Sequence, residues 1–373
     1  MAVIVLGGGL VGTASAFFLA RRGIEVTLIE RARIGAGATI ASFGNVRRSG
    51  RHLSQLLLAR RSLTLWNQAE ALLGRDVEFR ATGHLRLIFD PESLADMRRF
   101  AEAARPYGLE LDELEAGDIR RRFPGLGPQA IAASFSPEDG SANPRLVAPA
   151  FAAAAAANGA AIVDEARVSR IMRNELGFLV ETTRGHFGAE TVLNCAGAWG
   201  AAIAEQFGEP VPLKPFGPQM GVTEPLPHRI EPVVGVWSQG HGPYFRQVER
   251  GNIVFGGAVD RVPVQLDPGF AKPDPGRLPA QLGALLLLLP ALRDVAVIRQ
   301  WSGCEGYVAD NLPIIGASST TPGLFHAFGF CGHGFQLGPG VGETMAELIA
   351  TGATEIKLEP FSPGRFANAQ AAV

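Results

Sequence analysis

The chain has 373 residues, of which 47% are hydrophobic, and its 34 basic and 36 acidic residues give a formal net charge of −2. This length and apolar content predict two domains with packed cores and exclude a disordered chain, while the balanced charge argues against nucleic acid as a partner. Cys195, Cys304 and Cys331 are far apart and form no C-x-x-C pair, so no metal site and no disulfide framework are expected.

Targeting signals are not expected either. A strand begins at residue 2 with no basic segment before it, which argues against a signal peptide. The longest apolar run, residues 284–292, is too short to span a bilayer, so no membrane span is expected. Together with the cysteine usage, these features favour a reducing, cytoplasmic location.

The first thirty residues predict a strand, a helix and a second strand. Residues 3–6 form a short apolar run, and apolar residues then recur at helical spacing from Leu10 to Phe18. Gly23 is a typical helix stop, and residues 24–30 alternate like a strand that ends in Glu30.

Further elements are predicted along the rest of the chain. Helices are expected at residues 53–73, 93–107 and 143–159, the last with Asn143 as its N-cap and Pro144 as its first residue. Residues 160–197 are typical of a meander, and residues 210–300 favour a mostly antiparallel sheet. A Gly-rich loop at 329–340 should lead into a last helix whose buried face begins at Val341 and which ends at Gly352.

The glycines between the first strand and the first helix point to a dinucleotide. Gly7, Gly9 and Gly12 fit G-x-G-x-x-G, in which the glycines permit a tight turn, close approach of a phosphate and close packing of helix on strand. The helix N-terminus would bind a pyrophosphate. Glu30, 18 residues beyond Gly12, would bind a ribose 2′-hydroxyl and repel a 2′-phosphate, which disfavours NADP. This unit alone does not separate NAD from FAD.

Four further segments carry a resemblance to a family. They are "GAGATIASFGN" at 35–45, "TVLNCAGAWG" at 191–200, "WSGCEGYVADNLPIIG" at 301–316 and "GFCGHGFQLGPGVG" at 329–342. In this order they resemble the FAD-dependent D-amino-acid oxidase superfamily over nearly the whole chain. The resemblance is greatest to glycine and sarcosine oxidases, iminodiacetate oxidase-like proteins, and the flavin subunits of opine and D-hydroxyproline dehydrogenases.

This resemblance implies an α/β fold with two domains. A Rossmann-like FAD-binding domain would comprise residues 1–80, 145–212 and 300–373. A second, α+β substrate domain, built on a mostly antiparallel sheet, would comprise residues 81–144 and 213–299. The FAD is expected to be non-covalent, because Cys304 differs by one residue in its spacing to Asp310 from the cysteine that links the flavin in some sarcosine oxidases.

The same resemblance implies the residues that contact the FAD. They are Gly7, Gly9, Leu10, Val11, Gly12, Glu30, Arg31, Ala38, Thr39, Ser42, Phe43, Gly44, Asn45, Val168, Cys195, Ala196, Gly197, Trp199, Gly303, Gly332, His333, Gly334, Phe335 and Gln336. The backbone amides of the Gly-rich stretch 329–340 would stabilise negative charge on the reduced flavin.

The expected substrate anchor departs from the family pattern. Glycine-oxidase-like members carry an arginine for the substrate carboxylate where this chain has Glu305, and a second arginine position is Gly332 here. Replacement candidates are Arg47, Arg48, Arg51 and His52 after the second flavin loop, and Tyr244, Arg246 and Tyr307. Those expected to act in catalysis are Arg51, Tyr244, Arg246, Tyr307 and His333.

Two of these side chains keep alternative interpretations. Glu305 would attract a cationic or secondary amine group, or it would turn outward to solvent. His333 would support the flavin edge or act as a base.

The predicted function is oxidation of the C–N bond of a carboxylate-bearing primary or secondary amine, such as an N-substituted glycine of the sarcosine, iminodiacetate, opine or hydroxyproline type. A hydride would pass to flavin N5, and water would hydrolyse the imine. The alternatives are a 2-hydroxy-acid oxidoreductase, a flavin subunit of a hetero-oligomeric dehydrogenase and an NAD-dependent dehydrogenase.

The electron acceptor would be oxygen, a quinone or a partner subunit, within a homo- or hetero-oligomer. Val254 stands where sarcosine oxidases have a lysine that promotes the reaction with oxygen, so the resemblance favours an acceptor other than oxygen.

Overall fold

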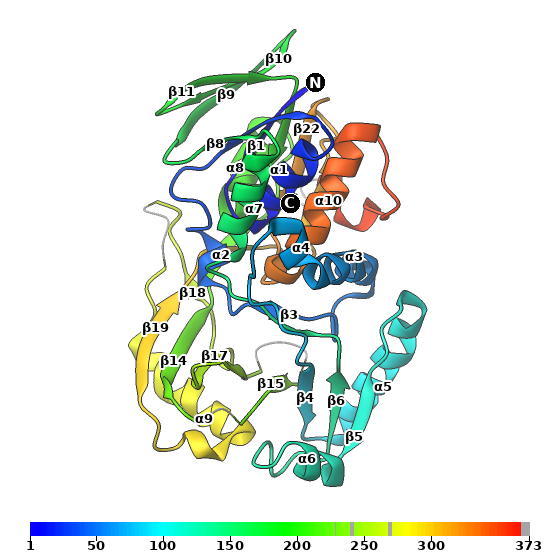
Figure 1. Cartoon of the computed structure of the whole chain (residues 1–373), viewed down its shortest axis with the longest axis vertical. Coiled ribbons are helices and arrows are strands. Elements are labelled where there is room, and N and C mark those ends of the chain that lie inside the picture. The colour runs from blue at the N-terminus through cyan, green and yellow to red at the C-terminus, as the bar shows by residue number, and fades with distance from the viewer. Residues whose placement is uncertain (228, 239–241, 268–270, 367–373) are drawn as a thin grey trace, which may run out of the picture.

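The computed structural model describes residues 1–227, 229–238, 242–267 and 271–366. It has a six-stranded sheet near one end of the long axis and an eight-stranded sheet near the other (Figure 1). The predicted mixed α/β architecture is confirmed. Within the described residues, no helix combines the length and apolarity needed to cross a membrane. The division of the chain into two domains at residues 80, 145, 212 and 300 stays a prediction.

The six-stranded sheet is built from three separate stretches of the chain. Its order is β21 (Ile314–Ala317), β22 (Leu324–Phe328), β12 (Thr191–Asn194), β1 (Ala2–Leu6), β2 (Glu25–Ile29) and β8 (Ala161–Val163). Neighbours run parallel except for β21, which is antiparallel to β22. Val3–Leu6 are buried, as expected for a central strand that is covered on both faces.

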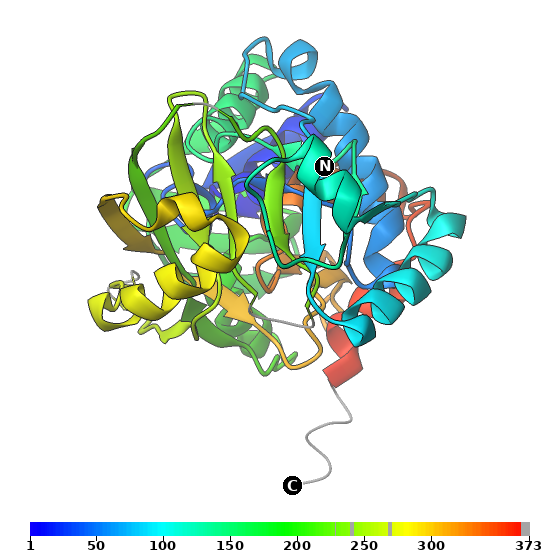
Figure 2. The same ribbon diagram turned by 90° about the horizontal axis from the view of Figure 1, so that it is seen from below.

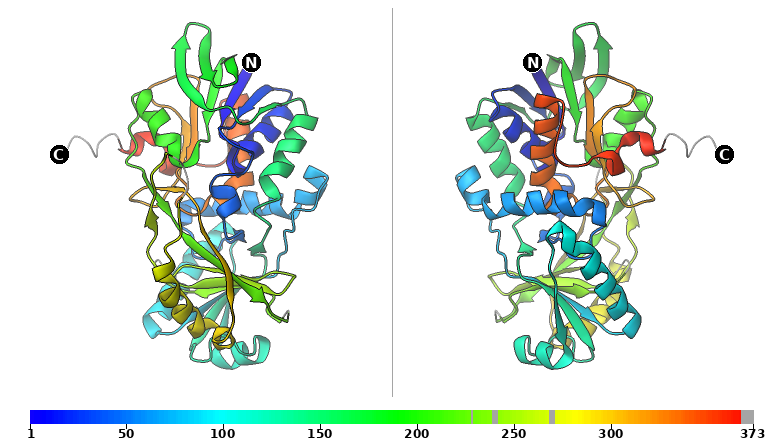
Figure 3. Two further views of the ribbon diagram at one scale, coloured as in Figure 1. Left: turned by 90° about the vertical axis from the view of Figure 1, so that its left-hand side faces the viewer. Right: turned by 90° about the vertical axis from the view of Figure 1, so that its right-hand side faces the viewer.

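The helices are, in chain order, α1 (Leu10–Ala20), α2 (Ala38–Ala41), α3 (Leu56–Asn67), α4 (Ala69–Leu73), α5 (Pro91–Ala104), α6 (Ala116–Arg122), α7 (Val147–Ala157), α8 (Gly200–Gln206), α9 (Leu278–Leu288) and α10 (Gly334–Thr351). Helices α7 and α10 pack against α1, and α3 packs against α10 (Figure 3). The helices expected at 53–73 and 93–107 are confirmed by α3, α4 and α5.

Helix α10 begins earlier than the sequence indicated. Residues 334–340 were expected in a loop, yet they form the first turns of the helix. The glycines there allow close helix packing: a Cβ at Gly338 would come 2.7 Å from the Leu10 side chain, and one at Gly342 would come 2.6 Å from Ala14 Cβ. Gly352 ends the helix in the left-handed conformation, as predicted.

The helix expected from residue 143 begins later, at Val147. Asn143 Oδ1 accepts a hydrogen bond from Arg145 N at 3.0 Å, and its Nδ2 donates to Glu78 Oε2 at 3.0 Å. The side chain therefore closes a local turn instead of capping the helix. The expected meander is also shorter than predicted: β9 (Val168–Asn174), β10 (Gly177–Thr182) and β11 (Gly185–Ala189) form it, whereas the flanking strands join the parallel sheet.

The eight-stranded sheet is mostly antiparallel, as predicted, with one parallel pair between β4 and β15. Its order is β19 (Val297–Ser302), β14 (Gln219–Pro225), β17 (Asn252–Gly256), β16 (Tyr244–Gln247), β15 (Val233–Val236), β4 (His84–Ile88), β6 (Ala132–Ser136) and β5 (Asp112–Glu115). Two small sheets complete the fold, β18 (Val262–Pro263) with β13 (Lys214–Gly217) and β20 (Glu305–Tyr307), and β3 (Asn45–Val46) with β7 (Gly140–Ser141).

The two faces of this sheet differ in chemistry because side chains alternate along each strand. On β4 and β16, Leu85, Leu87 and Phe245 pack into a core with α6 and α9, which Figure 2 shows in front of the sheet. The intervening residues, including His84, Arg86 and Tyr244, point to the opposite face. That face is the floor of a cavity described below.

Candidate active site

A cavity of about 650 Å³ lies at the ends of β1, β2 and β12, beside the first turn of α1. Its walls contain 17 of the residues expected to contact FAD. They are Gly7, Gly9, Leu10, Val11, Glu30, Arg31, Ala38, Thr39, Ser42, Val168, Cys195, Ala196, Gly197, Trp199, Gly332, Gly334 and Phe335. A parallel sheet brings the carboxyl ends of its strands to one edge, which explains why residues so distant in sequence meet here.

The glycine loop has the geometry that a phosphate cradle needs. Gly7 has a φ of +110° and its α-carbon lies against the backbone of Cys195, so a side chain at this position would be strained and would clash. A Cβ at Gly12 would overlap the Gly7 carbonyl oxygen, so this glycine serves the contact between helix and strand and lies outside the cavity wall. Gly9 precedes the helix, and the amide of Leu10 donates to Thr39 Oγ1 at 2.9 Å.

Glu30 stands at the end of β2 and lines the same cavity. Its Oε2 accepts from Gly8 N at 2.6 Å, and its Oε1 accepts from Ala32 N at 2.8 Å. Two backbone amides thus fix a carboxylate beside the glycine loop, where a ribose hydroxyl would donate to it.

The remaining expected FAD contacts lie outside this cavity. Phe43, Asn45 and His333 line a second cavity, whereas Gly12, Gly44, Gly303 and Gln336 line neither. Gln336 was expected to reach the flavin or the substrate. Instead its Nε2 donates to the Ala59 carbonyl at 2.9 Å, because the early start of α10 turns this side chain toward α3.

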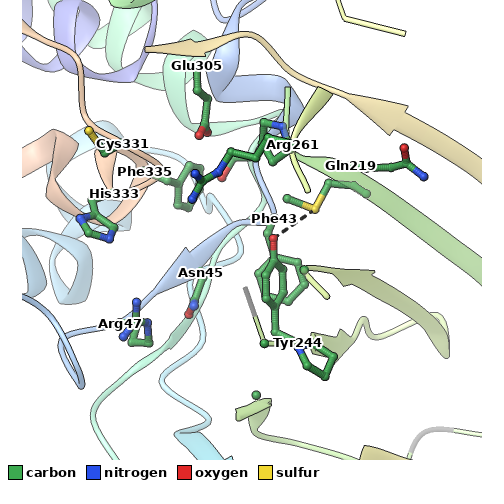
Figure 4. A pocket seen from close by; sticks show the side chains of 18 of the residues that line it. Phe43, Asn45, Arg47, Gln219, Tyr244, Arg261, Glu305, Cys331, His333 and Phe335 are labelled. Carbon is green, nitrogen blue, oxygen red and sulfur yellow. Dashed lines mark hydrogen bonds between the residues drawn. The ribbon is translucent and has the colours of Figure 1, made fainter. Parts of the chain in front are cut away.

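The second cavity, of about 240 Å³, adjoins the first (Figure 4). The two share five residues, namely Ser42, Glu305, Cys331, Gly332 and Phe335. A ligand of the larger cavity that reaches these five residues would therefore face a ligand bound in the smaller cavity. The smaller cavity lies between the Gly-rich segment 331–335 and the polar face of the eight-stranded sheet.

Glu305 and Tyr307 lie on β20; Glu305 stands at this junction, and Tyr307 lines the smaller cavity beside it. The Tyr307 hydroxyl donates to Glu305 Oε2 at 2.6 Å. Burial raises the pKa of Glu305 above its ordinary value of 4.5, while the Tyr307 hydrogen bond and the charge of Arg261 oppose that rise. The guanidinium of Arg261 lies 4.0 Å from the centre of the Tyr307 ring. The expectation that Glu305 turns outward to solvent is therefore wrong.

Three of the five residues expected in catalysis line the second cavity: Tyr244, Tyr307 and His333. Burial, with the charges of Arg51, Arg47 and Arg261, lowers the pKa of His333 well below its ordinary value of 6.5, so the ring is neutral. Burial raises the pKa of Tyr244, and its hydroxyl contacts Met220 Sδ at 3.7 Å.

The other two arginines lie behind the cavity wall. Arg51 Nε donates to the Arg47 carbonyl at 2.5 Å, and Arg246 Nε donates to the Phe43 carbonyl at 2.9 Å. Arg51 therefore supports the loop between β3 and α3, and Arg246 supports the segment before β3. Neither side chain lines the cavity.

Among the basic residues of this cavity, sequence reasoning missed three: His84, Arg86 and Arg261. The first two occupy alternate positions in β4, next to buried Leu85 and Leu87. That alternation of "HLRLI" is a signal that could have identified a polar face. Arg261 follows β17 in a loop, where the local sequence gives no such signal.

Comparison with known proteins identifies the family. A family model described as FAD dependent oxidoreductase matches residues 2–348. The chain belongs to this family. This finding confirms the predicted resemblance, the enzyme class and the FAD cofactor, and it removes the NAD-dependent alternative.

Individual relatives cover nearly the whole chain. The crystal structure of L-proline dehydrogenase from P. horikoshii has a TM-score of 0.92 and 30% sequence identity over 99% of this chain and 98% of that one. Glycine oxidase from Geobacillus kaustophilus is 29% identical over 96% of both chains, and a subunit of opine oxidase from Rhizobium meliloti is 29% identical over 98% of both. Mouse dimethylglycine dehydrogenase is 27% identical, but the chain spans only 44% of its length.

The larger cavity fits FAD by its own construction. The glycine loop and the N-terminus of α1 present backbone amides to a diphosphate, and Glu30 presents acceptors to a ribose. Cys304 also lines this cavity, and burial raises the pKa of its thiol to about 11, so the thiol is not ionised at neutral pH.

Proposed function

We propose that this enzyme oxidises the C–N bond of a secondary or primary amine that carries a carboxylate. The observation that carries the proposal is the position of Glu305 at the junction of the two cavities, beside Tyr307 and Arg261. An amino acid presents a positive amine next to a negative carboxylate. This junction presents a carboxylate next to a guanidinium, which is the complementary pattern.

In this proposal Glu305 binds the substrate ammonium group and takes its proton. A neutral amine has the lone pair that expels hydride from the adjacent carbon. The raised pKa of Glu305 brings it closer to the pH of catalysis, which favours a general base. A carboxylate also accepts a secondary ammonium without requiring more than one N–H group, so N-substituted amino acids fit this position.

Arg261 is the proposed partner of the carboxylate next to the reacting carbon. Its side chain reaches the cavity over the face of Tyr307. A guanidinium binds a carboxylate through two parallel hydrogen bonds, which would fix the substrate's orientation as well as its position. Tyr307 thereby contacts both charged groups and is proposed to hold them apart.

The FAD would supply the acceptor for the hydride. The residues proposed to hold it are the glycine loop, Glu30, and the wall of the larger cavity from Cys195 to Trp199. Phe43 and Tyr244, whose rings lie 4.8 Å apart edge to face, form an apolar side of the substrate cavity that would limit access of water.

The proposal includes an electron acceptor other than oxygen, for which a quinone or a partner protein is suitable. Its support is the valine at position 254 and the similarity to a protein described as one subunit of an opine oxidase. A cytoplasmic location and a hetero-oligomer are part of the same proposal.

The test is anaerobic reduction of the purified holoenzyme, followed at the flavin absorbance between roughly 350 and 500 nm. Sarcosine, proline and iminodiacetate are compared with glycine and with lactate. We expect the N-substituted amino acids to bleach the band faster than glycine, and lactate to leave it unchanged. Bleaching by lactate alone would replace the proposal with oxidation of 2-hydroxy acids.

A further inference from the structure

The substrate cavity has a second end with an excess of buried positive charge. Arg47 and Arg86 line it, and Arg51 lies directly behind. Arg51 and Arg86 are only 5% and 9% exposed. Burial lowers the pKa of all three guanidinium groups, and the positive charge of Arg47 lowers those of Arg51 and Arg86 further. Such groups are rarely buried together without anions.

One buried carboxylate, Asp139, offsets only part of these charges, since it acts on all three arginines at once. Asp139 is completely buried, but its oxygens accept from the backbone amides of Arg48 and Ser49, and it pairs with the Arg48 guanidinium. Glu138 is exposed and pairs with Arg48 as well.

Asp96 is the other acidic group that acts on Arg86. It bonds the indole nitrogen of Trp237 and pairs with Arg99, while Arg86 lies on the face of the Trp237 ring, 4.2 Å from its centre. The charge of Asp96 therefore acts on Arg86 and on Arg99 together.

Buried polar atoms without partners point to the same place. Burial and three arginine charges lower the pKa of His84 well below 6.5, so its ring is neutral. Its Nε2 lies 3.5 Å from Asn45 Nδ2, which leaves the other ring nitrogen, Nδ1, for a further partner. That Nδ1, like one terminal nitrogen of Arg51, finds no hydrogen-bond partner among the described residues. Buried polar atoms without partners are costly, and a ligand in the cavity would satisfy the ring of His84, which lines it.

This end is separate from the site of the reacting amine. In Figure 4, Glu305 and Arg47 lie on opposite sides of the cavity, with His333 and Arg261 between them. The effects of the two arginine charges on pKa values divide in the same way. The charge of Arg47 lowers the pKa of His84, Arg86 and His333. The charge of Arg261 affects the pKa of Glu305, Tyr307 and His333. A single carboxylate beside the amine would leave the far arginines without an anion.

We infer that the far end binds a second carboxylate of the substrate, through Arg47, Arg86 and His84. Resting on the proposed function, this inference makes the preferred substrate a secondary amine that carries a carboxylate on each nitrogen substituent, an N-(carboxyalkyl) amino acid. A monocarboxylate occupies only the Arg261 end, and its binding would leave the far charges buried and unpaired.

The kinetic test uses two substrates that differ only in the second carboxylate, iminodiacetate and sarcosine. A charged hydrogen-bond partner contributes about 13- to 160-fold in affinity, so we expect Arg47→Gln to lower kcat/KM for iminodiacetate by that factor and for sarcosine by less than about threefold. Arg47→Lys should recover part of the loss. Arg120→Gln, the same change at an exposed position on α6, should alter neither value.

Equal losses for both substrates in Arg47→Gln would overturn the inference, because Arg47 would then bind the carboxylate beside the amine. Equal kcat/KM of the wild-type enzyme for the two substrates would overturn it as well. Arg261→Gln provides the contrast, since it should lower kcat/KM for both substrates.

A binding test separates this inference from the proposed function. Glutarate and butyrate carry no amine, and their binding to the holoenzyme is followed by the change in flavin absorbance. We expect glutarate to bind at least about tenfold more tightly than butyrate, and Arg47→Gln to remove that preference. If no amine is oxidised but glutarate binds in this way, the proposed function fails and the dianion site stands. If amines are oxidised and glutarate has no advantage, the dianion site fails alone.

Discussion

Replacing Tyr307 by phenylalanine tests the role of Glu305, because it removes one oxygen atom and leaves the ring. The Tyr307 hydroxyl donates to Glu305 Oε2 at 2.6 Å, a distance typical of a hydrogen bond to an ionised carboxylate. Such a bond contributes about 1.5–3 kcal/mol, or about 13- to 160-fold. Because the bond favours the ionised form, its loss raises the pKa of Glu305 further.

The assay is the pH profile of kcat/KM for a secondary amine. If the ionised form of Glu305 takes the substrate proton, kcat/KM rises with pH as Glu305 ionises. We expect Tyr307→Phe to lower kcat/KM by about 13- to 160-fold below this inflection, to move the inflection to higher pH, and to approach the wild-type value above it.

Tyr244→Phe is the matched control, since the Tyr244 hydroxyl contacts Met220 Sδ rather than a carboxylate. It should leave the inflection of the profile in place. An equal loss at every pH in Tyr307→Phe, or a shift of its inflection to lower pH, would refute the assignment of Glu305 as the base.

Three further predictions concern the cofactor, the fold and the acceptor. Gly9→Ala adds a methyl group 3.3 Å from Thr39 Oγ1 at the cavity wall, so it should weaken FAD binding to the apoprotein without changing the Tm of the apoprotein. Gly12→Ala places its methyl group against the Gly7 carbonyl oxygen, so it should lower the Tm of the apoprotein. The expected decrease is about 1–4 °C, from about 1–3 kcal/mol of overpacking on a chain of this length; an equal Tm for both variants would contradict it. Burial alone would raise the pKa of Glu209, but hydrogen bonds from His326, Ser318 and Ser319 lower it to about 2, below its ordinary 4.5. The stability that this carboxylate contributes is therefore present above pH 4.5 and is lost as the pH falls toward 2. Glu209→Gln should lower the free energy of unfolding, measured in urea, by about 1.5–3 kcal/mol at pH 7 and by progressively less in acid. Finally, the reduced enzyme should react slowly with oxygen in stopped flow, and Val254→Lys should accelerate that reaction; rapid reoxidation of the wild-type enzyme would contradict the proposed acceptor.

The glycine loop and Glu30 were predictable from local sequence, whereas the other walls of the nucleotide cavity were expected only from the family resemblance. A tight turn, a helix N-terminus and an acid at the end of the next strand all lie within residues 2–30, and the constraints on Gly7 and Gly12 are backbone contacts. The errors at Asn143 and at the start of α10 also have a local cause. Asn143 can close a turn as readily as it can cap a helix. Glycine has a low helix propensity, which tertiary packing overrides at the start of α10.

The substrate cavity was predicted less well because its residues come from strands that only the fold brings together. The family resemblance identified Glu305 at a position where an arginine was expected, but the direction of its side chain is defined by the hydrogen bond from Tyr307, which the sequence does not reveal. Arg246 and Arg51 have the right residue type and lie close to the cavity, yet neither side chain lines it. Arg261 lines the cavity, and nothing in its immediate sequence distinguishes it from the other arginines of the chain, whereas Arg86 lies in an alternating strand whose pattern indicates a polar face.

The charges of the cavity follow from how the sheet divides its faces. On β4 the leucines must point into the core with α6 and α9, so residues 84 and 86 must face the substrate cavity. The core therefore fixes the positions of these side chains but leaves their chemistry open. Glu305 on β20, Arg86 on β4 and Arg261 after β17 thus line one cavity on a fold that the apolar core determines without them. Under the proposed function, the positions of these three charges determine which substrate the cavity binds.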